Sequence, residues 1–234
     1  MAVNYTEREM TEFKDSANWK TLDVIVSAAS IAGLFHDFGK ANILFQNKLL
    51  PKNRRKKDSK TYEPYRHEWI SLRLFQTFVV TYGNDKAWLQ ALTSIDAENI
   101  NQPFKDGIEG TVSKNHPLIN LPPFAKLVAW LILSHHKLPL SPSWKDGVDA
   151  APIECINEWF SEDFNALWNS YNCNELQEVV ADNWTFAESG LPYQSEAWRY
   201  NAKDIALSSL NIVSGIDNFD FITDHIFTSH TARL

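Results

Sequence analysis

The chain has 234 residues with a formal net charge of −7, and 44% of its residues are hydrophobic while 22% are charged. This balance is typical of a folded protein with one large domain, or at most two small ones, and it excludes a disordered chain. The acidic total excludes a protein that binds nucleic acid through a generally basic surface, although bound cations change the local field of a single site.

The first predicted helix leads to the most informative residues of the chain. Asp15 or Ser16 is a suitable N-cap, and the stretch from Leu22 to Phe35 is apolar or small almost all round, as in a buried helix. This helix delivers the pair His36-Asp37 just before Gly39, a residue at which a helix commonly ends or bends.

Further helices are predicted wherever apolar residues recur at helical spacing. An amphipathic segment covers 41–50, and after a basic loop the predicted helices cover 69–82, 87–95, 124–133, 152–171, 174–184, 198–213 and 219–227. Several Gly, Pro and Asn residues in 97–123 predict irregular structure there. Since we find neither β alternation nor an internal repeat, the predicted fold class is all-α.

Histidines lie near the ends of two of these helices. His67 lies at the start of the helix over 69–82, and the most apolar helix, opened by Pro122-Pro123, ends at His135-His136. Imidazole and carboxylate are the side chains that bind divalent transition metals. Adjacent residues on a helix point about 100° apart, so the pair His36-Asp37 needs partners from other helices.

A structural interpretation competes with the metal interpretation. A single buried histidine is most often a residue whose ring nitrogens are hydrogen-bonded within the fold. Here both doublets end apolar helices, so both place polar groups at the rim of a core. Burying such groups unpaired costs about 2 kcal/mol or more each, and a shared metal removes that penalty. Spacing alone leaves the two interpretations about equal.

Three motifs add a resemblance to a known family. His36-Asp-Phe-Gly-Lys40 resembles the HDxGK signature of the HD-domain metal phosphohydrolases. With Arg66-His67-Glu68, Ser134-His135-His136 and the run AGLFHDFGKANILFQNKL over 32–49, the chain is most similar to the HD nuclease domain of the CRISPR-associated nuclease–helicase of type I systems, subtype I-F. The resemblance implies an all-α HD helical bundle with irregular insertions over 1–234, shortened at both ends relative to the family.

The resemblance also implies a site with two divalent ions. Asp37 would bridge the ions, with His36 on one of them and His67, His135 and His136 on the other. The ions would be Mn, Ni, Co, Fe or Zn, and they would activate water for endonucleolytic cleavage of single-stranded DNA. Lys40 resembles a family lysine that faces the phosphate, and the alternative for Lys40 is a solvated residue at a helix end.

The chain departs from the family pattern at two ligands. No histidine precedes His36, and the family's downstream aspartate is not met before the chain reaches Leu234. Three nearby carboxylates are more typical of a surface: Asp217, Asp220 and Asp224. We therefore expect one ion to be bound well, by the donors other than His36, and the second ion to be bound weakly.

The partners implied by the resemblance are single-stranded DNA, a helicase module of the same polypeptide, the RNA-guided surveillance complex, the adaptation integrase and inhibitor proteins. The sequence has no GxxxxGK[ST] loop of a helicase motor. Its N-terminus lacks the apolar core of a signal peptide, and no run reaches the roughly 18 apolar residues of a membrane span. With only Cys155 and Cys173, we expect inert thiols and a soluble protein of the cytoplasm.

A basic run supplies candidate DNA contacts. Residues 48–60 contain seven lysines and arginines and one acid, and the candidate DNA-binding residues are Arg54, Arg55, Lys56 and Lys57. A solvated loop is the alternative. Trp144 is a candidate for stacking on a base, whereas Trp69 and Trp130 lie in apolar helical patterns and are predicted core residues.

Two other functions stay open at this point. One is an HD phosphohydrolase that acts on nucleotides or cyclic dinucleotides. The other is a catalytically silent module that binds other domains or an inhibitor.

Overall fold

The computed structural model describes residues 7–50, 63–96, 104–108, 117–136, 177–186 and 190–216, with the side chains of the first helix described from Thr21 onward. Within these ranges the regular structure is helical, and extended pairing is limited to one isolated antiparallel bridge between Asn42 and Phe186. The predicted all-α fold class is therefore confirmed.

The helical elements follow the predicted order. They are α1 (Glu7–Phe35), the 3-10 helix η1 (Phe38–Ala41), α2 (Ile43–Leu49), α4 (His67–Val80), α5 (Asp85–Leu92), α6 (Pro123–Ser134), α8 (Gln177–Asn183), the 3-10 helix η4 (Pro192–Gln194) and α9 (Glu196–Ser214). Apart from the start of α1, the ends of the described α-helices lie within about three residues of the predicted ones, and the two 3-10 helices were not predicted. The segments predicted over 152–171 and 219–227 lie outside the described residues.

The first helix begins earlier than predicted. It starts at Glu7 and continues past Asp15 and Ser16, which were expected to cap it. A polar side chain that can cap a helix is also tolerated inside one when the flanking residues favour helix, as Glu and Lys do here. The expected N-cap was therefore wrong, while the end of the helix at Phe35 is as predicted. The helix is buried on one face only, since Val24, Ala28 and Ile31 belong to the core whereas Leu22 and Val26 are more than half exposed.

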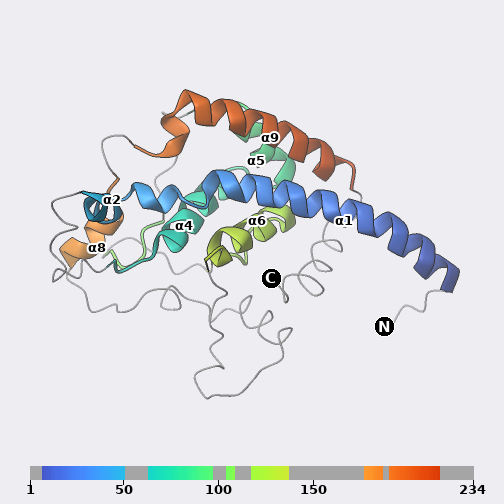
Figure 1. Ribbon diagram of the computed structural model, residues 1–234, viewed down its shortest axis with the longest axis horizontal. Helices are drawn as coiled ribbons and strands as arrows, with labels where there is room; N and C mark the ends of the chain where they lie inside the picture. The colour runs from blue at the N-terminus through green and yellow to red at the C-terminus, as the bar shows by residue number, and fades with distance from the viewer. Residues whose placement is uncertain are drawn as a thin grey trace, which may run out of the picture.

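The helices pack around α4. The longest helix, α1, crosses the molecule with α9 along one side and α4 and α6 along the other (Figure 1). Every side chain of α4 from His67 to Val79 is buried, and Trp69 and Trp130 are core residues as predicted. Because α6 contacts both α1 and α4, and η1 contacts α4, the end of α1, the start of α4 and the end of α6 converge.

One stretch passes a membrane-span test by length and composition. It covers Thr21–Ala41 with a mean hydropathy of 1.3, although sequence analysis expected no such run. Of this window 44% is buried inside the fold, and residues such as Ile31 and Phe35 belong to the core. A core helix of this kind satisfies the same test, so the stretch is weak evidence for a membrane segment.

Candidate metal centre

His36 and Asp37 lie in the turn between α1 and η1. The His36 Nδ1 atom is 2.9 Å from the carbonyl oxygen of Gly33. Since a carbonyl only accepts hydrogen bonds, this contact favours a proton on Nδ1 and a lone pair on Nε2. That Nε2 atom lies 3.3 Å from Asp37 Oδ2. Two lone-pair atoms at this separation repel each other unless a proton or a metal ion lies between them.

Gly39 brings this turn against the start of α4. Its backbone N–H donates to Ser71 Oγ at 2.8 Å, and a Cβ at this position would overlap the backbone of His67. Glycine is therefore required here by the close approach of two backbones. The consequence is that His67, the first residue of α4, lies beside the His36-Asp37 turn.

His135 and His136 directly follow α6. The His135 Nδ1 atom is 2.7 Å from the carbonyl oxygen of Ile132, which favours a lone pair on its Nε2 as at His36. The Nε2 atoms of His136 and His67 are 3.1 Å apart. At this distance the two rings either share one proton or both face the same cation.

The donor atoms form two overlapping groups. One group is His67, His135 and His136, and the other is His36, Asp37 and His135; within each, the donor atoms lie within 4.8 Å of one another. Asp37 belongs to the second group, but its Oδ1 atom also approaches the first. It is 3.7 Å from His67 Nε2 and 3.9 Å from His135 Nε2. The structure thus brings all five predicted ligands together. It differs from the predicted division of ligands because His135 belongs to both groups.

This donor set fits a divalent transition metal. Several imidazoles with one carboxylate are a ligand combination that Zn, Fe, Mn, Ni and Co accept. Lys40 Nζ lies 2.8 Å from both oxygens of Asp37, but only its contact with Oδ2 has hydrogen-bond geometry, and Oδ1 is shielded from solvent. A shielded carboxylate oxygen that faces two imidazole nitrogens is well placed to be a metal ligand.

Burial keeps two of the imidazoles neutral. It is the largest of the effects that bring the pKa of His67 to about 4; the neighbouring Lys40, His136 and His135 act in the same direction, and Glu68 opposes them. Burial also lowers the pKa of His135. At neutral pH these rings are therefore unprotonated, which is the form that binds a metal.

The carboxylate of Asp37 is held in its ionised form. Its burial tends to raise the pKa, but the hydrogen bond from Lys40 and the charges of His36, Lys40 and His67 outweigh this effect and leave the pKa below its ordinary value. An ionised oxygen close to neutral imidazoles gives the site a net affinity for cations.

Glu68 supports His67 from behind. This residue is 1% exposed, forms an ion pair with Arg66, and places Oε2 at 3.3 Å from His67 Nδ1. A carboxylate facing Nδ1 favours the tautomer whose Nε2 lone pair points towards Asp37 and His136. The Arg66-His67-Glu68 motif was visible in the sequence, but a role for Glu68 was not predicted. Adjacent residues of a helix usually point to different faces, so the motif gives no sign of this contact.

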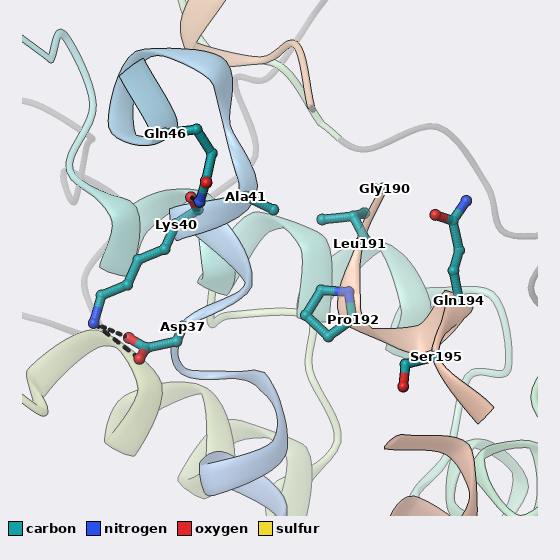
Figure 2. Close-up of a pocket in the computed structure, with 9 residues that line it drawn as sticks. All are labelled: Asp37, Lys40, Ala41, Gln46, Gly190, Leu191, Pro192, Gln194 and Ser195. Carbon is teal, nitrogen blue, oxygen red and sulfur yellow. Dashed lines mark hydrogen bonds and ion pairs between the residues drawn. The ribbon is translucent and has the colours of Figure 1, made fainter. Parts of the chain in front are cut away.

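A cavity of about 480 Å³ opens beside these ligands. Asp37, Lys40 and Ala41 line it on the side of η1, and the segment 190–195, which ends at the start of α9, lines the opposite side (Figure 2). This cavity could not be predicted from the sequence, because its two sides are far apart in the chain. The segment 190–195 also contains no charged residue that would suggest a site.

No family model matches the chain. Two curated proteins do match it, and each is named CRISPR-associated nuclease/helicase Cas3 subtype I-F/YPEST. The protein of Pectobacterium atrosepticum is 35% identical over 247 residues, which cover 99% of this chain and 21% of the relative. The protein of Pseudomonas aeruginosa is 30% identical over 238 residues, which cover 99% of this chain and 20% of the relative. The chain belongs to the subtype I-F Cas3 family.

Membership of the Cas3 family confirms the resemblance that the three motifs predicted. The chain spans about a fifth of the length of the Cas3 relatives it matches. Because the match covers 99% of the chain, the stretches that carry both histidine-containing doublets fall within the region shared with Cas3.

The remaining candidate residues lie outside the described part of the chain. These are Arg54, Arg55, Lys56, Lys57, Trp144, Asp217, Asp220 and Asp224. Their assignment in this Cas3 segment stays a prediction from sequence.

Proposed function

We propose that this Cas3 segment is a metal-dependent HD nuclease domain that cleaves single-stranded DNA during CRISPR interference. The observation that supports this best is the pair of overlapping donor groups around the shielded Oδ1 atom of Asp37. The name of the two relatives, nuclease/helicase, supports hydrolysis of phosphodiester bonds.

The ligands would be His67, His135 and His136 in one group, and His36, Asp37 and His135 in the other. Ions bound there would lower the pKa of a water molecule and stabilise the leaving oxygen of the phosphodiester. Burial lowers the pKa of His67 and of His135 and so keeps these two donors unprotonated, and Glu68 orients His67. Lys40 lies at the edge of the site and offers a positive charge to a non-bridging phosphate oxygen. A phosphate must compete with Asp37 for this lysine, since the two side chains form an ion pair.

We also propose the wider setting of this activity. Residues 1–234 would form the HD domain, and a helicase module elsewhere in the longer Cas3 polypeptide would deliver the DNA strand. The RNA-guided surveillance complex, the adaptation integrase and inhibitor proteins are proposed partners in the cytoplasm. Mn, Ni, Co, Fe and Zn all suit the imidazole-rich donor set.

The cavity beside Asp37 and Lys40 favours a second candidate, a phosphohydrolase that acts on nucleotides or cyclic dinucleotides. A third candidate is a catalytically silent module that contacts other domains. Substrate choice separates the three, because the nuclease cleaves circular single-stranded DNA, the phosphohydrolase turns over small nucleotides only, and the silent module does neither.

The test combines metal titration with a nuclease assay. We expect calorimetry to show one tightly bound ion and a second, weaker one. Asp37→Ala should abolish the cleavage of circular single-stranded DNA in the presence of Mn, Ni or Co. His36→Ala should retain the tight ion and lose most of the cleavage.

Asp204→Ala serves as the control, since it removes an exposed acid of α9 far from the ligands in the sequence. Absence of cleavage by the unaltered protein with all three metals would refute the nuclease assignment. Two ions of equal affinity would contradict the expected weakness of the second position.

A further inference from the structure

The cavity beside the metal centre is large enough for a small ligand. Its far side is formed by residues that are not metal ligands. Its volume of about 480 Å³ falls in the range of roughly 300–1,000 Å³ that is typical of small-molecule sites. Asp37 and Lys40 lie on one side, while Gln194 and Ser195 lie beyond Pro192 on the other (Figure 2).

The lining combines apolar surface with amide groups. Ala41, Leu191 and Pro192 provide the apolar part, and Gln46 and Gln194 provide the amides. A primary amide carries two donor hydrogens and an acceptor oxygen, and such side chains bind the edges of nucleic-acid bases. The Gln46 amide nitrogen donates to the carbonyl oxygen of Lys40 at 2.7 Å, which holds this side chain at the entrance of the metal centre.

The two ends of the cavity differ in charge, so they suit different parts of a nucleotide. Lys40 and the metal ligands lie at one end, where a phosphate is attracted. At the other end Gln194 and Ser195 are uncharged, and the exposed acid Glu196 that follows them is offset by the guanidinium of Arg199, which donates to the backbone carbonyls of Tyr193 and Gln194. A neutral base or sugar therefore suits the end at Gln194.

The far side of the cavity is fixed to the metal centre. The guanidinium of Arg199 donates to two backbone carbonyls of η4, at 3.0 and 2.8 Å. The indole N–H of Trp198 donates to the carbonyl oxygen of Leu34 at 3.1 Å, and its ring centroid lies 5.4 Å from that of Phe38. Since Phe38 directly follows Asp37, the distance between the cavity and the ligands is set by these contacts.

We propose that this cavity binds the nucleoside next to the scissile phosphate, with Gln46, beside Lys40, and Gln194, at the far end, as its positioning residues. This inference rests on the proposed phosphodiester hydrolysis and names the part of the substrate that the site recognises. Among the described residues, those that line the cavity include no aromatic ring, and the contacts that they offer to a base come from amides and apolar surface. The nucleoside can come from a DNA strand or from a mononucleotide.

The first test measures the contribution of the nucleoside with three chromogenic esters. They are the 5′- and 3′-(4-nitrophenyl phosphate) esters of thymidine and methyl 4-nitrophenyl phosphate. In each, water adds to phosphorus and the bond to 4-nitrophenolate breaks. With Mn, the protein should hydrolyse one thymidine ester with a kcat/KM about tenfold or more above the methyl ester.

The double variant Gln46→Ala/Gln194→Ala should reduce this kcat/KM ratio to about threefold or less, since it removes both amides. Gln90→Ala is the matched control, because Gln90 is an exposed glutamine of α5 that does not line the cavity. A ratio near one in the unaltered protein, or an unchanged ratio in the double variant, would overturn the proposal.

The second test does not depend on turnover. With Zn bound, saturation-transfer NMR should show transfer to the thymine ring protons of thymidine 5′-monophosphate or of a short oligothymidylate, and the double variant should lose most of it. Transfer to the oligonucleotide alone would identify a DNA strand as the source, and transfer to the mononucleotide alone would identify a mononucleotide.

The two proposals fail in different ways. If no ester and no DNA is hydrolysed but the thymine signal depends on the two glutamines, the proposed nuclease function fails and the nucleoside site stands. If hydrolysis occurs but the signal and the ratio do not depend on them, the nucleoside site fails alone.

Discussion

Asp37 contacts the lysine and several of the histidines of the site. Its two oxygens contact the Lys40 ammonium, while His36, His67 and His135 approach within 4 Å. Lys40 balances the negative charge, yet Oδ1 still faces the imidazoles without a hydrogen bond. A purely structural ion pair would not need three imidazoles around it, so this detail favours the metal interpretation over the structural one.

Gly39 offers a prediction at the scale of one residue. We expect Gly39→Ala to destabilise the fold by about 2 kcal/mol or more, because its Cβ would overlap the His67 backbone and displace the start of α4. Urea unfolding monitored by circular dichroism measures this change. Metal affinity should fall as well, since His67 moves with the backbone.

Gly33→Ala is the matched control for this substitution. Gly33 lies in α1, and a Cβ there would meet nothing within 4 Å. Removing a glycine from a helix interior should therefore stabilise the protein by about 0.5–1 kcal/mol. If both substitutions shift the unfolding midpoint in the same direction, the close approach of η1 and α4 is not what requires glycine at position 39.

At the scale of elements, α6 owes its start to another helix. Pro122 is its N-cap and makes no side-chain cap, so the first N–H groups of the helix need an outside acceptor. Asp85 of α5 supplies it, accepting from the backbone N–H groups of Phe124 and Ala125 at 2.9 Å each and from the Trp88 indole at 2.8 Å. The carboxylate thus joins α5 to the helix that ends at the histidine pair.

We predict that Asp85→Ala lowers the free energy of unfolding by about 2–4 kcal/mol, because three buried donors lose their acceptor. Asp85→Asn should cost less, since it keeps one acceptor oxygen. Asp204→Ala, which removes an exposed acid of α9, should change stability by less than about 0.5 kcal/mol. Equal losses for Asp85→Ala and Asp204→Ala in chemical unfolding would contradict the capping role.

The helices and donor residues that have a local sequence pattern could be predicted from the sequence. Pro122-Pro123 and the apolar run after it predicted α6. The two doublets at helix ends and the lone His67 at a helix start predicted all five residues of the donor groups. Asp85 could not be predicted as the cap of α6, because its hydrogen bond with the N–H of Phe124 joins residues 39 positions apart. The segment 190–195 opposite Lys40 was not predicted either, because its Gly190 and Pro192 are typical of an ordinary turn.

At the scale of the whole molecule, the site depends on how three helix ends converge. His36 and Asp37 follow α1, His67 begins α4, and the pair His135-His136 follows α6, so none of these helices can form the site alone. The donor atoms meet only when the aromatic core between the helices is packed. Unfolding and loss of the metal centre should therefore occur together.

The burial of His67 in the folded protein predicts how the stability of the metal-free protein depends on pH. In the unfolded chain His67 takes up a proton near pH 6.5, whereas in the folded protein burial lowers its pKa to about 4. Between these values the unfolded state binds more protons, so lowering the pH favours unfolding. Above pH 6.5 neither state binds the proton, and below pH 4 both states do. The lowered pKa of His135 acts in the same direction.

We expect the free energy of unfolding, measured in urea with EDTA present, to fall by about 2 kcal/mol between pH 7.5 and pH 5 through His67 alone. The lowered pKa of Asp37 does not contribute in this range, since that carboxylate is ionised in both states above its ordinary value of 3.8. His67→Gln removes the titrating ring and should flatten the profile. If this variant shows the same slope as the unaltered protein, the burial of His67 at the start of α4 does not set the acid sensitivity of the fold.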